Sequence, residues 1–413
     1  MTTIGSRISN TTESQGKPAF PAFVERRIDT FFDHLENFFG GDHPLHGRAP
    51  GPNAIHLCSN DYLCLSGTPE LVDAQTSTMK EGKDMLMSAP FLHGDNAYSR
   101  VEHKLASFLH AEDGIVCQSG WAANVGLIQT LAGPAVPVYL DMMAHASLWR
   151  GVNAANALPI PFRHNDVEHL ERQLDAHGPG IVAVDSVYST NGSMCPLVDI
   201  LDLTEKKGSV IVVDESHSLG THGPSGAGVV VALDLQDRVH FRTASLAKAF
   251  SGRAGFITCS SKYKSYFMSE SLPTIFSSAL LNHELAWFDA AVDFIAAADD
   301  RRARLMAVSH MLRQGLSDLG YNVSDGSEQI IALEVGPELQ TRVLRDALQM
   351  HGIFGAVFCA PATPKNRSLM RLTLNSGLTD VELERILTVC ETIREQVNLK
   401  DWSSTRRLKR RQE

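Results

Sequence analysis

The stretch "SVIVVDESHSLG", residues 209–220, decides the fold class. Four β-branched apolar residues follow one another without alternation, as is typical of a strand that is buried on both faces. Polar residues, among them Asp214 and His217, come where that strand should end. Similar runs separated by helix-length segments predict an α/β protein with a mostly parallel sheet covered on both sides. The other runs are "GIVCQSG" (114–120), "PVYLD" (137–141), "GIVAVDS" (180–186) and "VHFRTAS" (239–245).

The segments around this sheet predict a second, smaller domain. "FVERRIDTFFDHLENFF" (23–39) spaces apolar residues at three and four, which indicates an amphipathic helix before the sheet. After a long helical stretch, "IIALEVG" (330–336) and "LMRLTLN" (369–375) predict strands of an α+β unit. We therefore expect five parts: a disordered start (1–20), a helical extension (21–60), a large α/β domain (61–285), a small C-terminal α+β domain (286–396) and a basic, solvated tail (397–413).

Bulk properties exclude several classes of protein. The chain has 413 residues, a formal net charge of −10 and no apolar run long enough to span a membrane. The charge argues against nucleic-acid binding. The first twenty residues lack the apolar region of a secretory signal, and the seven cysteines are scattered without a C-x-x-C pair. We therefore expect reduced thiols and a cytoplasmic location.

A lysine among small residues gives the first chemical clue. Lys248 lies in "TASLAKAFSG" (243–252), where the small neighbours leave room for a bulky ligand. Lys248 follows the predicted strand at 239–245. The predicted strand before that one ends at Asp214, with His217 three residues later. Ligands of parallel sheets bind beyond the carboxyl ends of the strands, so these side chains should meet there. A carboxylate for a ring nitrogen and a lysine for a Schiff base are what pyridoxal phosphate (PLP) requires.

Further candidates fit the same cofactor but also have simpler explanations. Ser119 and Gly120 in "SGWAAN" (119–124) open a helix whose N-terminus suits a phosphate. Trp121 could pack beside the phosphate or the ring of the cofactor, and the simpler explanation is that it belongs to the core. His145 could stack on a face of the ring, and the simpler explanation is a structural hydrogen bond. Asp214 and His217 with His222 also allow a metal site, although no compact ligand set surrounds them, and we predict no metal. Ser277 and Ser278 in "FSSAL" (276–280) suit a phosphate or a helix cap.

The ordered set of motifs resembles the α-oxoamine synthases, which are PLP-dependent enzymes of fold type I that condense an amino acid with an acyl-CoA. The resemblance covers roughly residues 20–395, and is greatest to members that make α-amino- and α-hydroxyketone quorum-sensing autoinducers. The motifs are "SNDYL" (59–63), "SGWAAN", "DMMAHAS" (141–147), "VYSTNG" (187–192), "VDESHSLGTHGPSGAG" (213–228) and "ASLAKAF" (244–250).

This resemblance implies a role for each candidate. Lys248 matches the Schiff-base lysine, Asp214 the partner of the pyridine nitrogen, and His217 the donor to the ring oxygen, with Ser189 near it. His145 matches the residue stacked on the ring. Gly120 and Trp121 match positions next to the cofactor, and Ser245 matches a phosphate contact. Ser278 matches a residue that reaches the neighbouring subunit's phosphate. Arg371 matches the arginine that binds the amino-acid carboxylate, helped by Asn60.

The implied reaction is a decarboxylative condensation of an amino acid with a medium-chain acyl-CoA, in a homodimer with shared sites. The implied amino donor is 2-aminobutyrate or S-adenosylmethionine. Departures from the family pattern, in residues 87–106, at Ser245 and at "NSG" (375–377), leave the donor open. The alternatives are a relative that uses glycine, serine or alanine, an aminotransferase, and a non-catalytic ligand sensor.

Overall fold

The computed structural model describes residues 19–82, 88–90 and 97–412. The chain divides into two units, residues 1–46 and 47–413. In the first unit, α1 (Ala22–Phe39) confirms the predicted amphipathic helix and ends at Gly40 in the left-handed conformation (φ 61°). Most of the predicted disordered start lies outside the described residues.

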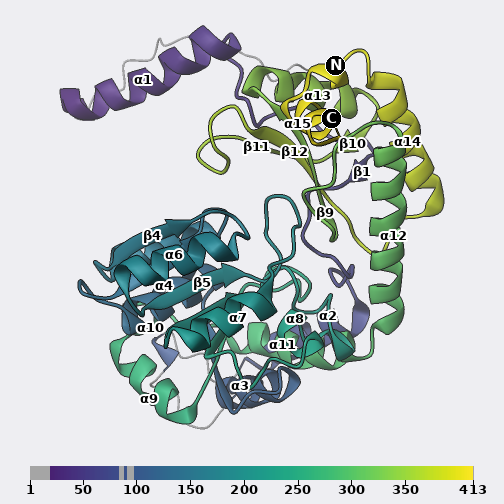
Figure 1. Ribbon diagram of the computed structural model, residues 1–413. Helices are drawn as coiled ribbons and strands as arrows, with labels where there is room; N and C mark the ends of the chain where they lie inside the picture. The colour runs from purple at the N-terminus through teal and green to yellow at the C-terminus, as the bar shows by residue number, and fades with distance from the viewer. Residues whose placement is uncertain (1–18, 83–87, 91–96, 413) are drawn as a thin grey trace. The chain divides into compact units, whose positions relative to one another are not determined.

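A seven-stranded sheet organises the second unit (Figure 1). Its strand order is β2-β8-β7-β6-β5-β3-β4, and β8 alone runs antiparallel to its neighbours. Residues of β5 are buried throughout, which confirms the two-sided burial that the apolar runs predict. The bounds are β2 (Asp113–Cys117), β3 (Pro137–Asp141), β4 (Leu158–Phe162), β5 (Ile181–Asp185), β6 (Val210–Asp214), β7 (Phe241–Ser245) and β8 (Gly255–Cys259).

Helices connect these strands, and their starts follow from local capping. Ser119 and Asp166 accept backbone N–H bonds at the starts of α4 and α6, as short polar side chains do at the N-cap. The helices and 3-10 turns between residues 69 and 296 are α2 (Pro69–Glu81), α3 (Ala97–Phe108), α4 (Gly120–Leu131), α5 (Ala146–Ala154), α6 (Val167–His177), α7 (Leu197–Lys206), η2 (Pro224–Gly226), α8 (Val229–Ala232), α9 (Ser261–Glu270), α10 (Leu272–Ile275) and α11 (Asn282–Ala296).

The long helix α12 (Asp299–Asp318) leads to a second, antiparallel sheet with the order β11-β12-β9. Figure 1 shows α12 running alongside this sheet and α14. A separate parallel pair joins β1 to β10. The remaining elements are β1 (Ile55–His56), β9 (Ile330–Gly336), α13 (Glu338–Met350), β10 (Ile353–Phe354), β11 (Ala356–Phe358), β12 (Ser368–Thr373), α14 (Asp380–Ile393), η3 (Leu399–Asp401) and α15 (Ser403–Gln412).

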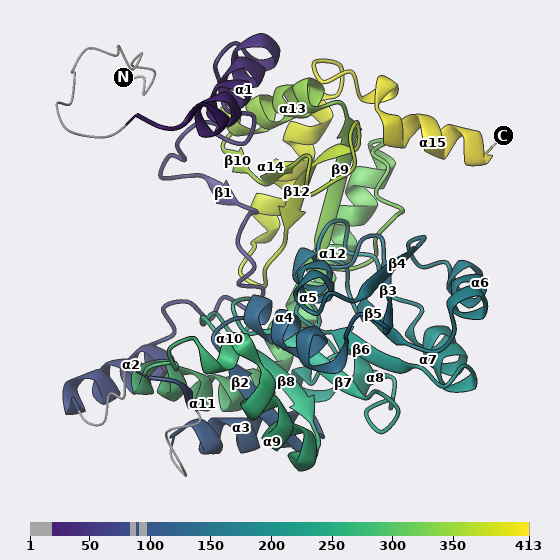
Figure 2. The ribbon, with the colours of Figure 1, turned by 90° about the vertical axis from the view of Figure 1, so that its left-hand side faces the viewer.

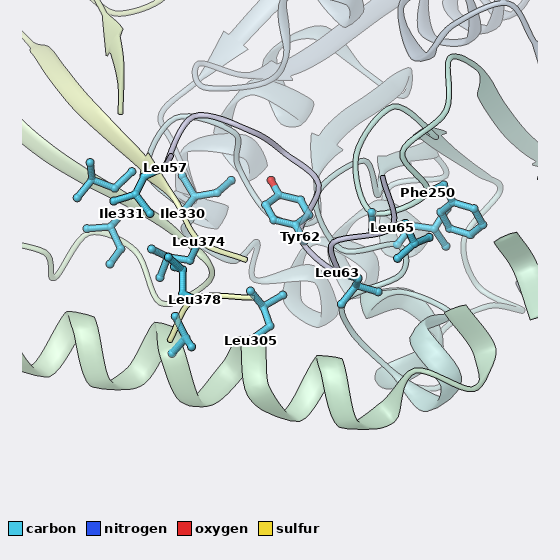
Figure 3. Close-up of a cluster of buried hydrophobic side chains, with 14 of the residues drawn as sticks. Leu57, Tyr62, Leu63, Leu65, Phe250, Leu305, Ile330, Ile331, Leu374 and Leu378 are labelled. Atoms are coloured by element: carbon cyan, nitrogen blue, oxygen red, sulfur yellow. The ribbon is translucent and has the colours of Figure 1, made fainter. Parts of the chain in front are cut away.

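One continuous apolar core joins the two sheets through the segment that follows β1. Figure 3 shows Leu57 and Ile330 gathered on one side of Tyr62, and Leu65 and Phe250 on the other. All five side chains are nearly or fully inaccessible to solvent. Burying such side chains contributes about 1.5–3 kcal/mol each, so this core fixes Tyr62 rigidly between the sheets.

The C-terminal tail corrects a prediction. The basic run "RRLKRRQE" (406–413) predicts a solvated, disordered end, yet most of it belongs to α15, a helix that packs against β9 (Figure 2). Buried Trp402 anchors it by an edge-to-face contact with Tyr321 at 5.5 Å between ring centroids. The basic composition of this segment gave no indication that Trp402 would be buried and would anchor a helix. No described helix is long and apolar enough to cross a membrane, and the predicted domain boundaries stay a prediction.

Candidate active site

A cavity of about 250 Å³ lies at the carboxyl ends of β5, β6 and β7. This is where ligands bind in open α/β sheets. Eight of the predicted residues line it together, although they come from four separate stretches of sequence. The lining residues are Ser119, Gly120, Trp121, Asn124, His145, Asp185, Asp214, Ser216, His217, Ser245 and Lys248.

Asp214 is held at the end of β6 by a network of hydrogen bonds. Asn124 Nδ2 donates to its Oδ2 over 2.7 Å, and the Ser216 backbone N–H donates to its Oδ1 over 2.8 Å. Asn124 is itself fixed, because Thr243 donates to its Oδ1 over 2.6 Å. The carboxylate is 3% exposed, so its direction is set by these partners rather than by water.

A second carboxyl group, Asp185, lies beside Asp214 in the register of β5 and β6. Burial, and then the charge of Asp214, raise the pKa of Asp185 well above its usual value. The His145 backbone N–H donates to its Oδ1 over 3.2 Å. Two adjacent buried carboxyls do not both ionise readily, and the raised pKa of Asp185 favours its neutral form.

The imidazole of His217 is neutral and oriented. Burial lowers its pKa well below the usual value, and the charges of Lys248 and Arg371 lower it further. Its Nδ1 is hydrogen-bonded to the Tyr62 hydroxyl over 2.6 Å. We assign the hydroxyl as the donor, which leaves the proton of His217 on Nε2. Gln329 Nε2 donates to the His217 carbonyl over 2.7 Å and so fixes the backbone as well.

The amine of Lys248 has no hydrogen bond or ion pair to any residue that the structure describes. Burial lowers its pKa, while Asp214 and Asp185 act in the opposite direction. A buried amine with a lowered pKa holds a larger neutral, nucleophilic fraction. The surroundings therefore leave this nitrogen available for a bond to carbon.

The rim of the cavity is formed by His145 and Trp121. His145 Nδ1 is hydrogen-bonded to Ser147 Oγ over 2.7 Å at the start of α5. The Trp121 ring lies edge-on to His145, with 6.2 Å between centroids and planes at 82°. Because Trp121 is 48% exposed, it is not the core residue that the simpler explanation proposed.

The start of α4 and the end of β7 approach each other closely in the cavity lining. A Cβ built on Gly120 would lie 2.5 Å from Ser245 Cβ, so only glycine fits this close approach. Ser119 Oγ accepts the Ala122 N–H over 3.0 Å. That bond satisfies one of the orphan donors at the helix start and leaves the first N–H groups for an anion.

A larger cavity of about 910 Å³ adjoins the first, because His145, His217 and Lys248 line both. Arg371 and Asn60 line the larger one and are in contact, since Arg371 Nη2 donates to Asn60 Oδ1 over 2.7 Å. Arg371 Nη1 donates to the Ser189 carbonyl over 2.9 Å, and its Nε is buried without a partner. This arrangement presents a cation with a spare donor beside Lys248.

Two predicted residues are absent from both cavities. Ser277 is half-buried and Ser278 is exposed, and neither lines the cavities of this single chain. The phosphate contact predicted for Ser277, and the contact with a neighbouring subunit's phosphate predicted for Ser278, both stay predictions. Conversely, sequence reasoning assigned no role to Asn124, Asp185 or Tyr62. The sequence signals for them are weak. Asp185 ends a predicted strand, Asn124 lies in the motif "SGWAAN" and Tyr62 lies in the motif "SNDYL".

The donor set fits PLP. The smaller cavity combines an oriented carboxylate, an amine without a partner and free N–H groups at a helix start, which suit the ring nitrogen, the aldehyde and the phosphate respectively. His222, the third residue of the metal alternative, is instead hydrogen-bonded through Nε2 to Glu328 over 2.8 Å. Within the described residues, no three His, Cys, Asp or Glu side chains converge as a metal site.

Comparison with known proteins agrees with this geometry. Residues 52–389 match the family model of class I and II aminotransferases. The chain is 42% identical to a CAI-1 autoinducer synthase from Vibrio campbellii, over 90% of this chain and 95% of that protein. It is 30% identical to a 2-amino-3-ketobutyrate coenzyme A ligase from Salmonella typhimurium, over 85% of this chain and 90% of that protein.

The fold also matches solved structures. A serine palmitoyltransferase from S. paucimobilis, solved with an adduct of PLP and myriocin, superposes with a TM-score of 0.84. The match covers 92% of this chain and all of the other, at 24% identity, and so concerns the fold.

Fold and site together define a PLP-dependent enzyme of fold type I. The chain belongs to the class I and II aminotransferase family and, within it, to the α-oxoamine synthases, which are acyltransferases. The resemblance inferred from the motifs is thereby confirmed.

Proposed function

We propose that this enzyme condenses an amino acid with a medium-chain acyl-CoA, with loss of carbon dioxide, to make an α-aminoketone precursor of a quorum-sensing autoinducer. The proposal rests mainly on the position of Lys248, which lines both the small and the large cavity and whose amine has no partner among the described residues. The 42% identity to a CAI-1 autoinducer synthase over nearly the whole chain supports the type of product.

The residues of the smaller cavity would hold PLP. Asp214 would pair with the ring nitrogen, His217 would donate from Nε2 to the ring oxygen, and His145 would cover one ring face. Ser119, Gly120, Trp121 and Ser245 would surround the phosphate, with Ser189 near the ring oxygen. When bound, PLP supplies an electron sink for the negative charge that develops at the amino-acid α-carbon.

The chain's own residues would perform the remaining tasks. Arg371, positioned by its bond to Asn60, would bind the amino-acid carboxylate through its spare Nε donor. The Lys248 amine would remove the α-proton, for which its lowered pKa provides the neutral form. Asp214 would face the ring nitrogen, and the raised pKa of Asp185 favours the neutral form of the carboxyl group beside it.

The substrate chemistry balances without any further reactant. The α-carbon forms a bond to the acyl carbonyl carbon, the thioester C–S bond breaks, and CoA leaves as its thiol. The α-carboxylate leaves as carbon dioxide, and a proton replaces it. We propose 2-aminobutyrate or S-adenosylmethionine as the donor, and glycine, serine or alanine are the alternatives to test. A homodimer in which Ser278 contacts the phosphate of the partner's site, and a cytoplasmic location, complete the proposal.

A product screen tests this function. The purified, PLP-loaded protein is incubated with each of the five amino acids and with acyl-CoAs of increasing chain length, and products are identified by mass spectrometry. We expect an α-aminoketone from a medium-chain acyl-CoA, with one free CoA thiol for each product molecule. Amino-group transfer to a keto acid without any need for CoA would instead establish an aminotransferase.

A further inference from the structure

The larger cavity is strongly cationic in an acidic protein. Five cationic side chains line it, against two carboxylates, although the whole chain has a formal net charge of −10. A cleft of one sign of charge attracts ligands of the other sign. The cationic residues are Arg163, Lys248, Arg367, Arg371 and Arg407, and the carboxylates are Asp325 and Glu334.

Arg371 and Lys248 already have roles in binding the amino acid and PLP, but Arg367 and Arg407 have none. Both of these guanidinium groups share one buried carboxylate: Arg367 Nη2 and Arg407 Nη1 each lie 2.7 Å from an oxygen of Glu334. Asp325 lies near Arg407 as well, so these two guanidinium groups face two carboxylates, and the excess positive charge of the cavity as a whole comes from its other cationic side chains. Arg407 Nη2 is buried without a hydrogen bond to any described residue, 3.7 Å from Asp325 Oδ2.

Arg407 comes from α15, so the basic C-terminal segment reaches the cleft. The helix is fixed at its start, because Ser404 Oγ donates to the Glu334 carbonyl over 2.6 Å and Asn322 Nδ2 donates to the Ser404 carbonyl over 2.8 Å. Ser404 also lines the cavity. The anchoring holds Arg407 in place before any ligand arrives, which lowers the entropic cost of binding.

We propose that Arg407 of α15, together with Arg367 of the segment before β12, binds a phosphate group of the acyl-CoA. This inference rests on the proposed function and adds a residue-level site for the nucleotide end of that substrate. Guanidinium groups bind phosphate oxygens with paired hydrogen bonds. The reactive thioester would then lie toward Lys248, which lines the same cavity.

Calorimetric titration of the full-length, PLP-loaded enzyme tests the site, with CoA, 3′-dephospho-CoA and pantetheine as probes. Arg407→Gln is the test variant, and Arg406→Gln is the matched control, because Arg406 is exposed, pairs with Asp401 and does not line the cavity. We expect Arg407→Gln to weaken CoA binding about tenfold or more. We expect the control to bind CoA as the wild type does.

Pantetheine separates binding from a purely structural role. It carries no phosphate, so its affinity should be equal for the wild type and Arg407→Gln. The dephospho probe shows which phosphate is bound: if it binds the wild type and Arg407→Gln equally, the contact is to the 3′-phosphate. If it loses affinity in the variant as CoA does, the contact is to the diphosphate. Either pattern supports the proposal.

Two results would overturn the proposal. In the first, Arg407→Gln and Arg406→Gln bind CoA with equal affinity. In the second, Arg407→Gln loses as much affinity for pantetheine as it does for CoA. If Arg407→Gln does not fold, Arg367→Gln and Arg407→Lys are titrated in its place. Failure of the proposed function is distinguishable. If the wild type binds CoA through Arg407 but yields no ketone, the phosphate site is supported and the proposed function is wrong. If the enzyme makes the ketone but Arg407→Gln binds CoA normally, the function is supported and the phosphate site is wrong.

Discussion

Replacing Gly120 by alanine should damage both the fold and the cofactor site. The added Cβ would lie 2.5 Å from Ser245 Cβ and 2.8 Å from Ser245 Cα, well inside the ordinary contact range that begins near 3.4 Å. The start of α4 and the end of β7 must therefore separate by several tenths of an ångström or more. Overpacking of this kind costs about 1–3 kcal/mol.

The assay is thermal unfolding of the PLP-free and PLP-saturated protein. Gly120→Ala should lower the midpoint of the PLP-free protein and should also reduce the gain in midpoint that PLP provides, because the displaced groups line the cofactor cavity. Gly133→Ala is the matched control, since a Cβ there meets no heavy atom within 4 Å. The reasoning is refuted if both variants unfold alike and respond alike to PLP.

Three further outcomes concern buried polar groups. Arg242→Ala should lower the free energy of unfolding by about 3–5 kcal/mol, because it leaves the buried Glu215 carboxylate without its ion-pair partner. Urea denaturation measures this loss, and a value below about 1 kcal/mol would contradict the prediction. Tyr62→Phe should cost about 1–3 kcal/mol and reduce kcat, because His217 Nδ1 loses its partner; unchanged stability and kcat would speak against the assigned tautomer. Burial holds the pKa of His217 well below 6.5, so the unfolded chain binds a proton below that pH while the folded chain does not. Stability should therefore fall as pH falls below 6.5, by up to about 1.4 kcal/mol per pH unit from this group, and His217→Gln should show a smaller decline between pH 7.5 and 5.5 in urea denaturation; an equal decline would assign the effect elsewhere.

Local sequence patterns predicted most of the buried strands but not the whole sheet. The apolar runs correctly located β2, β3, β5, β6 and β7, because burial on both faces demands such residues at every position. They gave no sign of β8, although all of its residues are buried. They missed β4, "LPIPF" (158–162), whose two prolines argue against a strand. Proline is tolerated there because β4 lies at the edge of the sheet, where its missing donor breaks no ladder.

The site was predictable where its residues end strands and unpredictable where they meet through the fold. Asp214 and Lys248 follow buried strands, so the parallel topology alone brings them to one edge. The contact between Tyr62 and His217 joins residues 155 positions apart and depends on core packing around the segment after β1. Arg407 reaches the larger cavity only because Trp402 anchors the tail, and no local pattern indicates that contact.

The central claim is that the Lys248 amine is the point at which this chain attaches PLP covalently. The most direct measurement is borohydride reduction of the PLP-loaded enzyme, followed by peptide mass spectrometry. We predict a phosphopyridoxyl group on Lys248 of the wild type and none at any lysine of Lys248→Ala. A wild type that retains no PLP after reduction, or carries it on another lysine, would show that Lys248 is not the attachment point.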